Sequence, residues 1–189
     1  MNSFTKLPTI TPKVADFGNW KSLRGDVVRL DGKITVLGFS GTNLLANRGN
    51  LFNLNQKIYQ RYHTFKDLQF VMLCPLGTEK DAQAVLDALK AFTDVKQWNF
   101  VFATPEEIAN FYKQMQLKSQ LDSNYGTSNV FIFDKERNLR GRKDKEEFKE
   151  GYNTFHPAEL SNEMLDDFKI LLYEYKAALK KNNNATKQL

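Results

Sequence analysis

Cysteine and histidine are scarce in this chain. Its 189 residues include one cysteine, Cys74, and two histidines, His63 and His156. A single cysteine excludes an intramolecular disulfide and a cysteine-based metal cluster. The two histidines are far apart in the sequence and do not have the spacing of a zinc site. We therefore expect no bound metal and no other cofactor.

Long hydrophobic runs are also missing. No stretch of about 18 or more apolar residues occurs, so we expect no membrane-spanning segment within the chain. The first six residues, Met-Asn-Ser-Phe-Thr-Lys, lack the apolar core of a signal peptide. These absences predict a soluble chain, and they leave open an anchor ahead of Met1.

The excess positive charge is not spread over the chain. There are 27 Lys and Arg against 22 Asp and Glu, and four lysines lie in a C-terminal segment without acids: Lys176, Lys180, Lys181 and Lys187. The basic residues between 135 and 149 alternate with acids, which predicts a solvated face of mixed charge. Nucleic acids bind uncompensated basic stripes, so we expect no nucleic-acid partner.

The chain has ample material for a hydrophobic core. Hydrophobic residues make up 41% of the sequence and aromatic residues 13%, and aromatic side chains bury large apolar areas. A chain of this length fits a single domain. We expect a lead-in segment at residues 1–14, one domain at 15–180 and a flexible basic tail at 181–189.

Apolar runs between turn residues predict strands, and apolar positions at helical spacing predict helices. The expected strands are residues 14–17, 26–30, 33–39, 68–73, 98–102, 129–133 and 139–142. The expected helices are residues 47–62, a helix capped by Thr78, a helix opened by a capping box at residues 104–107, and a long helix capped by Ser161.

This order of elements predicts an α/β fold. Parallel β-α-β units followed by a β-hairpin and a terminal helix are the plan of a thioredoxin-like domain, with a central mixed β-sheet flanked by helices and a long C-terminal helix. Ligands of α/β proteins gather at the carboxyl ends of parallel strands. We therefore expect the functional site at the turn after the strand at residues 33–39.

Several short stretches carry the motifs of a known family. They are residues 31–39 (Asp-Gly-Lys-Ile-Thr-Val-Leu-Gly-Phe), 40–43 (Ser-Gly-Thr-Asn), 71–75 (Val-Met-Leu-Cys-Pro), 97–100 (Gln-Trp-Asn-Phe) and 130–141, which begins Val-Phe-Ile-Phe-Asp. Together they resemble the Sco/SenC family across residues 15–178. Members of this family have a thioredoxin fold and act in copper delivery and thiol redox during cytochrome oxidase assembly.

The resemblance has consequences for partner and location. It implies a protein partner, in the membrane-associated respiratory machinery. It also implies an extracytoplasmic, periplasmic and membrane-anchored protein, if an anchor precedes the chain. Without such an anchor we expect a cytoplasmic protein.

The reactive residues of the family are replaced in this chain. Its two cysteines would fall at Leu44 and Arg48, and its copper-binding histidine would fall at Gly126. Copper(I) prefers thiolate and imidazole ligands, and thiol exchange needs a reactive thiolate. The resemblance therefore implies a lost copper site and a lost dithiol. Our first interpretation is a non-catalytic binding or assembly module, in which redox catalysis is not expected.

Cys74 supports a second interpretation, a thiol- or copper-active protein. It follows an apolar strand and precedes Pro75, at the sheet end where ligands gather. Free cysteine usually behaves as a small buried apolar residue. No second cysteine is present to resolve an oxidised Cys74, so we predict that this thiol reacts slowly.

A third interpretation is a binding protein for an anionic small molecule, using the turn from Thr42 to Gly49. Arg48 lies at the start of the predicted helix, where free N–H groups attract anions. Asn43 and Asn47 could donate hydrogen bonds to the same ligand. The simpler alternative is an arginine that is solvated or paired with a carboxylate.

The loop before the strand at residues 129–133 is a further candidate surface. Tyr125 and Thr127 flank Gly126 in this loop, which faces the active turn in thioredoxin-like proteins. We expect the backbone edge of this loop to contact a partner.

Overall fold

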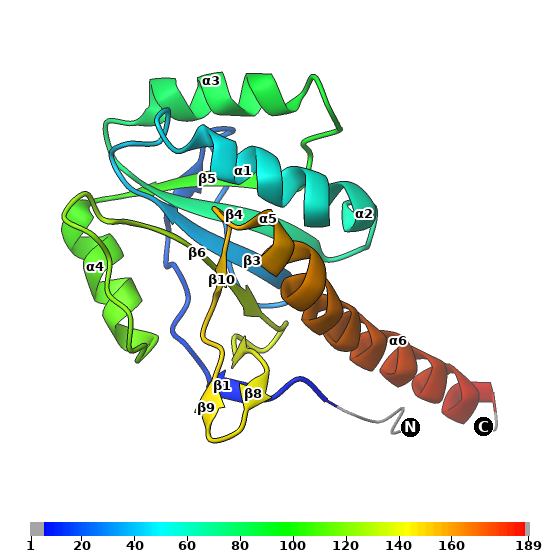
Figure 1. Cartoon of the computed structure of the whole chain (residues 1–189). Helices are drawn as coiled ribbons and strands as arrows, with labels where there is room; N and C mark the ends of the chain where they lie inside the picture. Colours follow the sequence, from blue (N-terminus) through cyan, green and yellow to red (C-terminus); the bar gives the residue numbers. More distant parts are fainter. Residues whose placement is uncertain (1–5, 188–189) are drawn as a thin grey trace.

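A mixed β-sheet forms the centre of the molecule (Figure 1). The computed structural model describes residues 6–187. The parallel strands are β3 (Ile34–Ser40), β4 (Leu68–Pro75) and β5 (Trp98–Ala103), and β6 (Gly126–Phe133) runs antiparallel to β3. The strand order is β1-β7-β6-β3-β4-β5-β2. The carboxyl ends of β3 and β4 and the first residue of β6 therefore lie at the same end of the strands, which is the edge of the sheet meant below for the candidate site.

Short strands complete the structure. The sheet also contains β1 (Thr9–Thr11) paired with β7 (Leu139–Arg140), β2 (Lys21–Ser22) paired with β5, and β10 (Tyr152–Asn153) paired with β6. A separate hairpin consists of β8 (Lys143–Asp144) and β9 (Glu147–Phe148).

Helices cover both faces of the sheet (Figure 1). One face carries α1 (Arg48–Leu54), the π-helical turn η1 (Asn55–Tyr59), α2 (Gln60–Tyr62), α3 (Glu79–Leu89) and α6 (Leu165–Lys187). The opposite face carries α4 (Pro105–Gln114). The short helix α5 (Pro157–Glu159) and the π-helical turn η2 (Leu160–Met164) lead into α6. Within the described residues, none of these helices has the length and hydropathy needed to cross a membrane.

The central strands are buried on both sides, because alternate residues point to opposite helical layers. In β3, Val36 packs with the helices α1, α3 and α6, whereas Leu37 and Phe39 pack with α4. Every residue of β3 and of β4 is buried. The strands predicted at residues 33–39, 68–73, 98–102 and 129–133 and the thioredoxin-like plan are confirmed.

The outer edge of β5 is covered by backbone and by one arginine. The N–H of Leu23 donates to the carbonyl of Phe100. The guanidinium of Arg24 donates to the carbonyls of Trp98 and Val95, at 3.0 and 2.9 Å. Several backbone carbonyls along this edge therefore already have partners.

Two local predictions about helices are confirmed. Thr104 and Glu107 form a reciprocal capping box at the start of α4. Residues 47–62 are almost entirely helical, although the π-helical turn η1 interrupts the α-helix. In that turn the buried side chain of Asn55 accepts a hydrogen bond from the indole of Trp98.

Two predicted strands are wrong. The described chain forms loops, not strands, over most of residues 14–17 and 26–30. The carboxylate of Asp16 accepts hydrogen bonds from the backbone N–H groups of Phe17 and Leu30. These bonds take up donors that a strand ladder would use, so both segments stay irregular.

Of two predicted helix caps, Thr78 is confirmed in position only, and Ser161 is wrong. Thr78 occupies the N-cap position of α3, but its hydroxyl donates to the carbonyl of Pro75 and does not accept from the helix. Ser161 lies inside the π-helical turn η2, because the helical backbone already begins at Pro157 after His156. Proline is favoured at the first helical position, which explains the earlier start.

Both ends of the described chain, residues 6–187, contain regular secondary structure. Strand β1 lies within residues 1–14 and joins the sheet. Helix α6 continues to Lys187, across most of the segment predicted to be a flexible tail. Leu179 is 60% exposed, so the last part of α6 leaves the core. The domain boundaries at residues 15 and 180 remain predictions.

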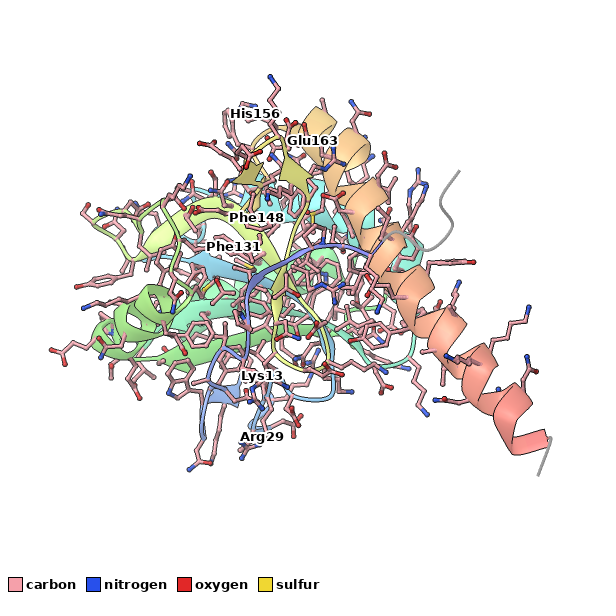
Figure 2. All side chains as sticks on the ribbon, turned by 90° about the horizontal axis from the view of Figure 1, so that it is seen from below. Lys13, Arg29, Phe131, Phe148, His156 and Glu163 are labelled. Atoms are coloured by element: carbon pink, nitrogen blue, oxygen red, sulfur yellow. The ribbon has the colours of Figure 1, made fainter. Side chains whose placement is uncertain are left out.

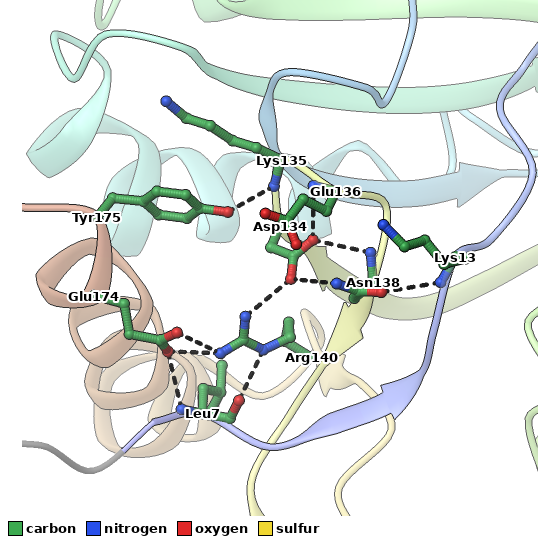
Figure 3. Close-up of polar contacts among 9 residues, drawn as sticks. All are labelled: Leu7, Lys13, Asp134, Lys135, Glu136, Asn138, Arg140, Glu174 and Tyr175. Atoms are coloured by element: carbon green, nitrogen blue, oxygen red, sulfur yellow. Dashed lines mark hydrogen bonds and ion pairs between the residues drawn. The ribbon is translucent and has the colours of Figure 1, made fainter. Parts of the chain in front are cut away.

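The expectation of a solvated mixed-charge face at residues 135–149 is wrong in part. Arg140 is buried, and Figure 3 shows its guanidinium between two carboxylates from distant parts of the chain. It donates to Asp134 at 2.9 Å, to Glu174 of α6 at 2.6 Å, and to the carbonyl of Leu7 at 2.7 Å. This cluster joins the β6–β7 hairpin, α6 and the N-terminal segment.

Candidate functional site

The candidate site begins with a close approach of two glycines. Gly41 follows β3 with a φ of 66°, in the region that glycine tolerates best. A Cβ added to Gly126 would lie 3.0 Å from the Cα and from the N of Gly41. The N–H of Thr42 donates to the carbonyl of Asn124 at 3.0 Å. The turn after β3 is therefore fastened to the loop before β6.

Beside these glycines lies a cavity of about 220 Å³. Its wall combines the end of β3, the β3–α1 turn, α1, β4, the loop before β6, β6 itself and the loop after β10. The lining residues are Phe39, Ser40, Leu44, Asn47, Asn50, Leu51, Met72, Asp122, Gly126, Thr127, Ser128, Val130 and Thr154. The cavity thus lies at the sheet edge where the sequence predicted a site.

The polar groups of the cavity fall into two sets. Some already have partners, since Thr154 donates its hydroxyl proton to the carbonyl of Ser128. Others are available to a ligand, because the side chains of Asn47, Asn50 and Ser128 form no hydrogen bond with the described part of the chain. Carboxamides donate and accept, which suits a neutral polar ligand such as a peptide backbone.

Asp122 supplies the one charge among the described lining residues. Its Oδ1 accepts hydrogen bonds from the N–H groups of Asn124 and Gly126, at 2.8 and 3.1 Å. These bonds hold the carboxylate of Asp122 in the loop before β6, where it lines the cavity. A negative charge at this place disfavours an anionic ligand inside the cavity.

The structure locates the three positions at which the resemblance places the lost ligands. Leu44 and Gly126 are both buried, and both line the cavity. Arg48 is exposed, and its guanidinium donates to the carbonyl of Leu45 at 2.7 Å. Copper(I) needs soft donors, and these residues do not supply them. No group of three potential metal-ligating His, Cys, Asp or Glu residues occurs within residues 6–187.

Cys74 lies close to this edge of the sheet but is closed off from solvent. Its side chain has no exposed surface, and its thiol donates weakly to the carbonyl of Met72. Burial raises the pKa of the Cys74 thiol from the ordinary 9.0 to about 12. The thiolate is the nucleophile and the metal ligand, so both the burial and the raised pKa agree with the prediction that Cys74 reacts slowly, which remains a prediction.

Of the other predicted site residues, some line the cavity and others do not. Asn47 and Thr127 line it, and Thr127 also accepts the N–H of Asn129. Thr42 and Asn43 are exposed outside the lining. Tyr125 has a φ of 65° and packs toward α4, away from the cavity lining.

Sequence reasoning missed several lining residues. Asn50, Met72, Asp122, Ser128 and Thr154 were not among the predicted site residues. A local signal existed for Asp122, because Asp before Ser-Asn-Tyr-Gly favours a turn in which its side chain accepts backbone N–H groups. No local signal existed for Thr154, which reaches the cavity from a loop more than a hundred residues after β3.

Comparison with known proteins gives matches only at the level of three-dimensional structure. No protein-family profile matches the chain, and no curated protein matches its sequence. The solved structure of BsSco, a member of the Sco family of cytochrome c oxidase assembly proteins, matches with a TM-score of 0.59 and 16% identity, over 93% of this chain and 98% of BsSco.

Two further solved structures have the same architecture. A protein of Aquifex aeolicus named for electron transfer matches with a TM-score of 0.58 and 17% identity, over 89% of this chain and 94% of its own. A Bacteroides thetaiotaomicron protein named as a protein disulfide isomerase matches with a TM-score of 0.53 and 14% identity, over 96% and 99%. The chain therefore has the thioredoxin-like fold, in a form shared with a member of the Sco family, as its motifs predicted.

Proposed function

We propose that this protein is a non-catalytic, Sco-like domain that binds a partner protein at the cavity beside the β3–α1 turn. The observation that carries the proposal is the wall of this cavity. Leu44 and Gly126 line it at positions where the resemblance places a cysteine and the copper-binding histidine. The side chains of this wall offer hydrogen bonds and apolar contact in place of soft ligands.

The chemistry of one thiol supports the proposed absence of thiol–disulfide catalysis. Thiol–disulfide exchange within a protein needs an attacking thiolate and a second sulfur. Cys74 is the sole cysteine of the sequence, and its pKa is raised to about 12 by burial. A rearranged copper or thiol site built on Cys74 is therefore the weaker alternative.

The kind of partner follows from the lining. Apolar side chains such as Leu44, Met72 and Val130 are mixed with the free carboxamides of Asn47 and Asn50. This combination suits an extended protein segment, whose side chain fills the apolar part while its backbone bonds to the amides. BsSco is a member of the Sco family of cytochrome c oxidase assembly proteins, which supports a partner in respiratory assembly. The location that we propose, outside the cytoplasm, is the one that the Sco/SenC resemblance implies.

Copper(I) titration against a chromogenic chelator separates the proposal from a copper-active Cys74. We expect the wild-type protein to take no copper from the chelator, and Cys74→Ala to behave identically. The double variant Leu44→Cys/Arg48→Cys is the positive control, because it returns two thiolates to the turn. A thiol reagent at pH 8 should likewise react only after unfolding. Tight copper binding that Cys74→Ala removes would establish the alternative.

Site-specific photo-crosslinking tests the binding role. A photoreactive phenylalanine analogue at Asn47, which lines the cavity, should give a discrete cross-linked product in cells of the native host. The matched control is Lys80, which is exposed on α3 outside the cavity. Thr127→Trp should abolish the product at Asn47 by filling the cavity. Equal products at Asn47 and Lys80, or none at either position, would refute the proposal.

An anion site at the turn from Thr42 to Gly49 has less support. The guanidinium of Arg48 is engaged by the carbonyl of Leu45, and Asp122 places a negative charge in the cavity wall. Titration with phosphate and sulfate, with Arg48→Ala as the control, decides this alternative.

A further inference from the structure

The outer face of α6 carries positive charge that the protein does not neutralise. Lys169, Tyr173, Lys176 and Lys180 follow one another at intervals of four, three and four residues, so they lie on one face of the helix. All four are exposed, and Tyr173 is 54% exposed. We call these four residues the α6 stripe. Lys181, also exposed, flanks it.

The acidic residues of α6 are used elsewhere. Asp167 pairs with Arg142 at 3.0 Å, and Glu174 pairs with Arg140 at 2.6 Å, both toward the body of the protein. Asp166 is exposed one turn from Lys169, but no ion pair joins them among the described residues. From Tyr175 onward α6 contains lysines and no acid. The stripe therefore keeps its charge.

The position of the helix makes the stripe accessible. Figure 2 shows α6 running along one side of the molecule and extending beyond the rest of it. In Figure 1 the C-terminal end of α6 lies at the end of the molecule opposite the start of α1.

We propose that the α6 stripe is a docking surface for a membrane that contains anionic phospholipids. The stripe is straight and about 16 Å long, from a rise of about 1.5 Å per residue, which matches a flat surface. Lysine is a compact charge on a flexible stem and binds headgroup phosphates without a fixed geometry. Tyr173, in the middle of the stripe, has an amphipathic ring that suits the headgroup region. With so few apolar residues on this face, the helix would lie on the membrane and not enter it.

Co-sedimentation with lipid vesicles tests this inference. The full chain should sediment with vesicles of phosphatidylcholine and phosphatidylserine, and not with vesicles of phosphatidylcholine alone. The triple variant Lys169→Gln/Lys176→Gln/Lys180→Gln should lower the partition coefficient at least about tenfold. The matched control, Lys66→Gln/Lys80→Gln/Lys113→Gln, removes the same charge from exposed sites on other elements and should retain binding. Added salt should weaken the interaction.

Other outcomes would overturn the inference. The first is that the protein does not bind to anionic vesicles. The second is that the two triple variants lose binding equally, which would indicate an effect of net charge alone. Duplex DNA that binds more tightly than the vesicles, with the same dependence on the three α6 lysines, would assign the stripe to nucleic acid. Circular dichroism of both variants verifies that α6 remains folded.

Discussion

Replacement of Arg140 by methionine should lower the free energy of unfolding by about 3–5 kcal/mol. Methionine fills a similar space but removes all the donors of the guanidinium. The carboxylate of Asp134, which is 2% exposed, would then remain buried without its cation. Glu174 and the carbonyl of Leu7 would lose their bonds at the same time. Chemical denaturation of both proteins, followed by tryptophan fluorescence, measures the difference.

The control for Arg140 is an ion pair on the surface. Lys90 pairs with Asp87 at 3.4 Å, and both side chains are more than half exposed. Exposed pairs contribute little, so Lys90→Met should change stability by less than about 1 kcal/mol. The loss of stability in Arg140→Lys should lie between those of Arg140→Met and Lys90→Met, since lysine keeps the charge but lacks the planar fork of the guanidinium. A loss below about 1 kcal/mol for Arg140→Met would show that the cluster does not hold the three segments together.

Gly126→His should destabilise the protein and should not rebuild a metal ligand. The new Cβ would lie 3.0 Å from the Cα and the N of Gly41 and 3.2 Å from the carbonyl carbon of Ser40. Both sides of the contact are backbone, so relief requires movement of β3 or β6. Overpacking of this kind costs about 1–3 kcal/mol for alanine, and histidine should cost at least as much.

A glycine without such contacts is the matched control for Gly126. Gly49 lies in α1, and an added Cβ there meets nothing within 4 Å. Gly49→Ala should stabilise the protein by up to about 1 kcal/mol, because alanine is the better helix former. If Gly126→Ala and Gly49→Ala changed the free energy of unfolding equally, the contact between Gly126 and Gly41 would not be tight. Denaturation curves of the three variants with and without copper(I) also test whether the histidine introduced by Gly126→His gains a ligand role.

The fold could be predicted from the sequence because its main signals are local. The uninterrupted apolar runs of β3 and β4 match strands buried on both faces, and the capping box at Thr104 needs residues only three apart. Predictions failed where a single distant side chain decides the local structure. The carboxylate of Asp16 holds Leu30, fourteen residues away, in a loop.

The candidate site could be predicted only in part. Its position followed from the end of β3, and Leu44, Asn47, Gly126 and Thr127 were named in advance. The remainder of the wall comes from separate elements that only the tertiary structure brings together, such as Thr154 after β10. Likewise, the alternating charges near Arg140 gave no indication that Glu174, in a distant helix, would complete a buried cluster.

The contacts of Arg24 along β5 have a consequence for self-association. An exposed strand edge is a template on which a second chain can add a strand, and such additions lead to polymers. A strand approaching β5 would first have to displace a guanidinium from the carbonyls of Trp98 and Val95. Arg24 therefore protects a phenylalanine-rich strand from edge-to-edge aggregation, at a place where β2 contributes only two residues to the sheet.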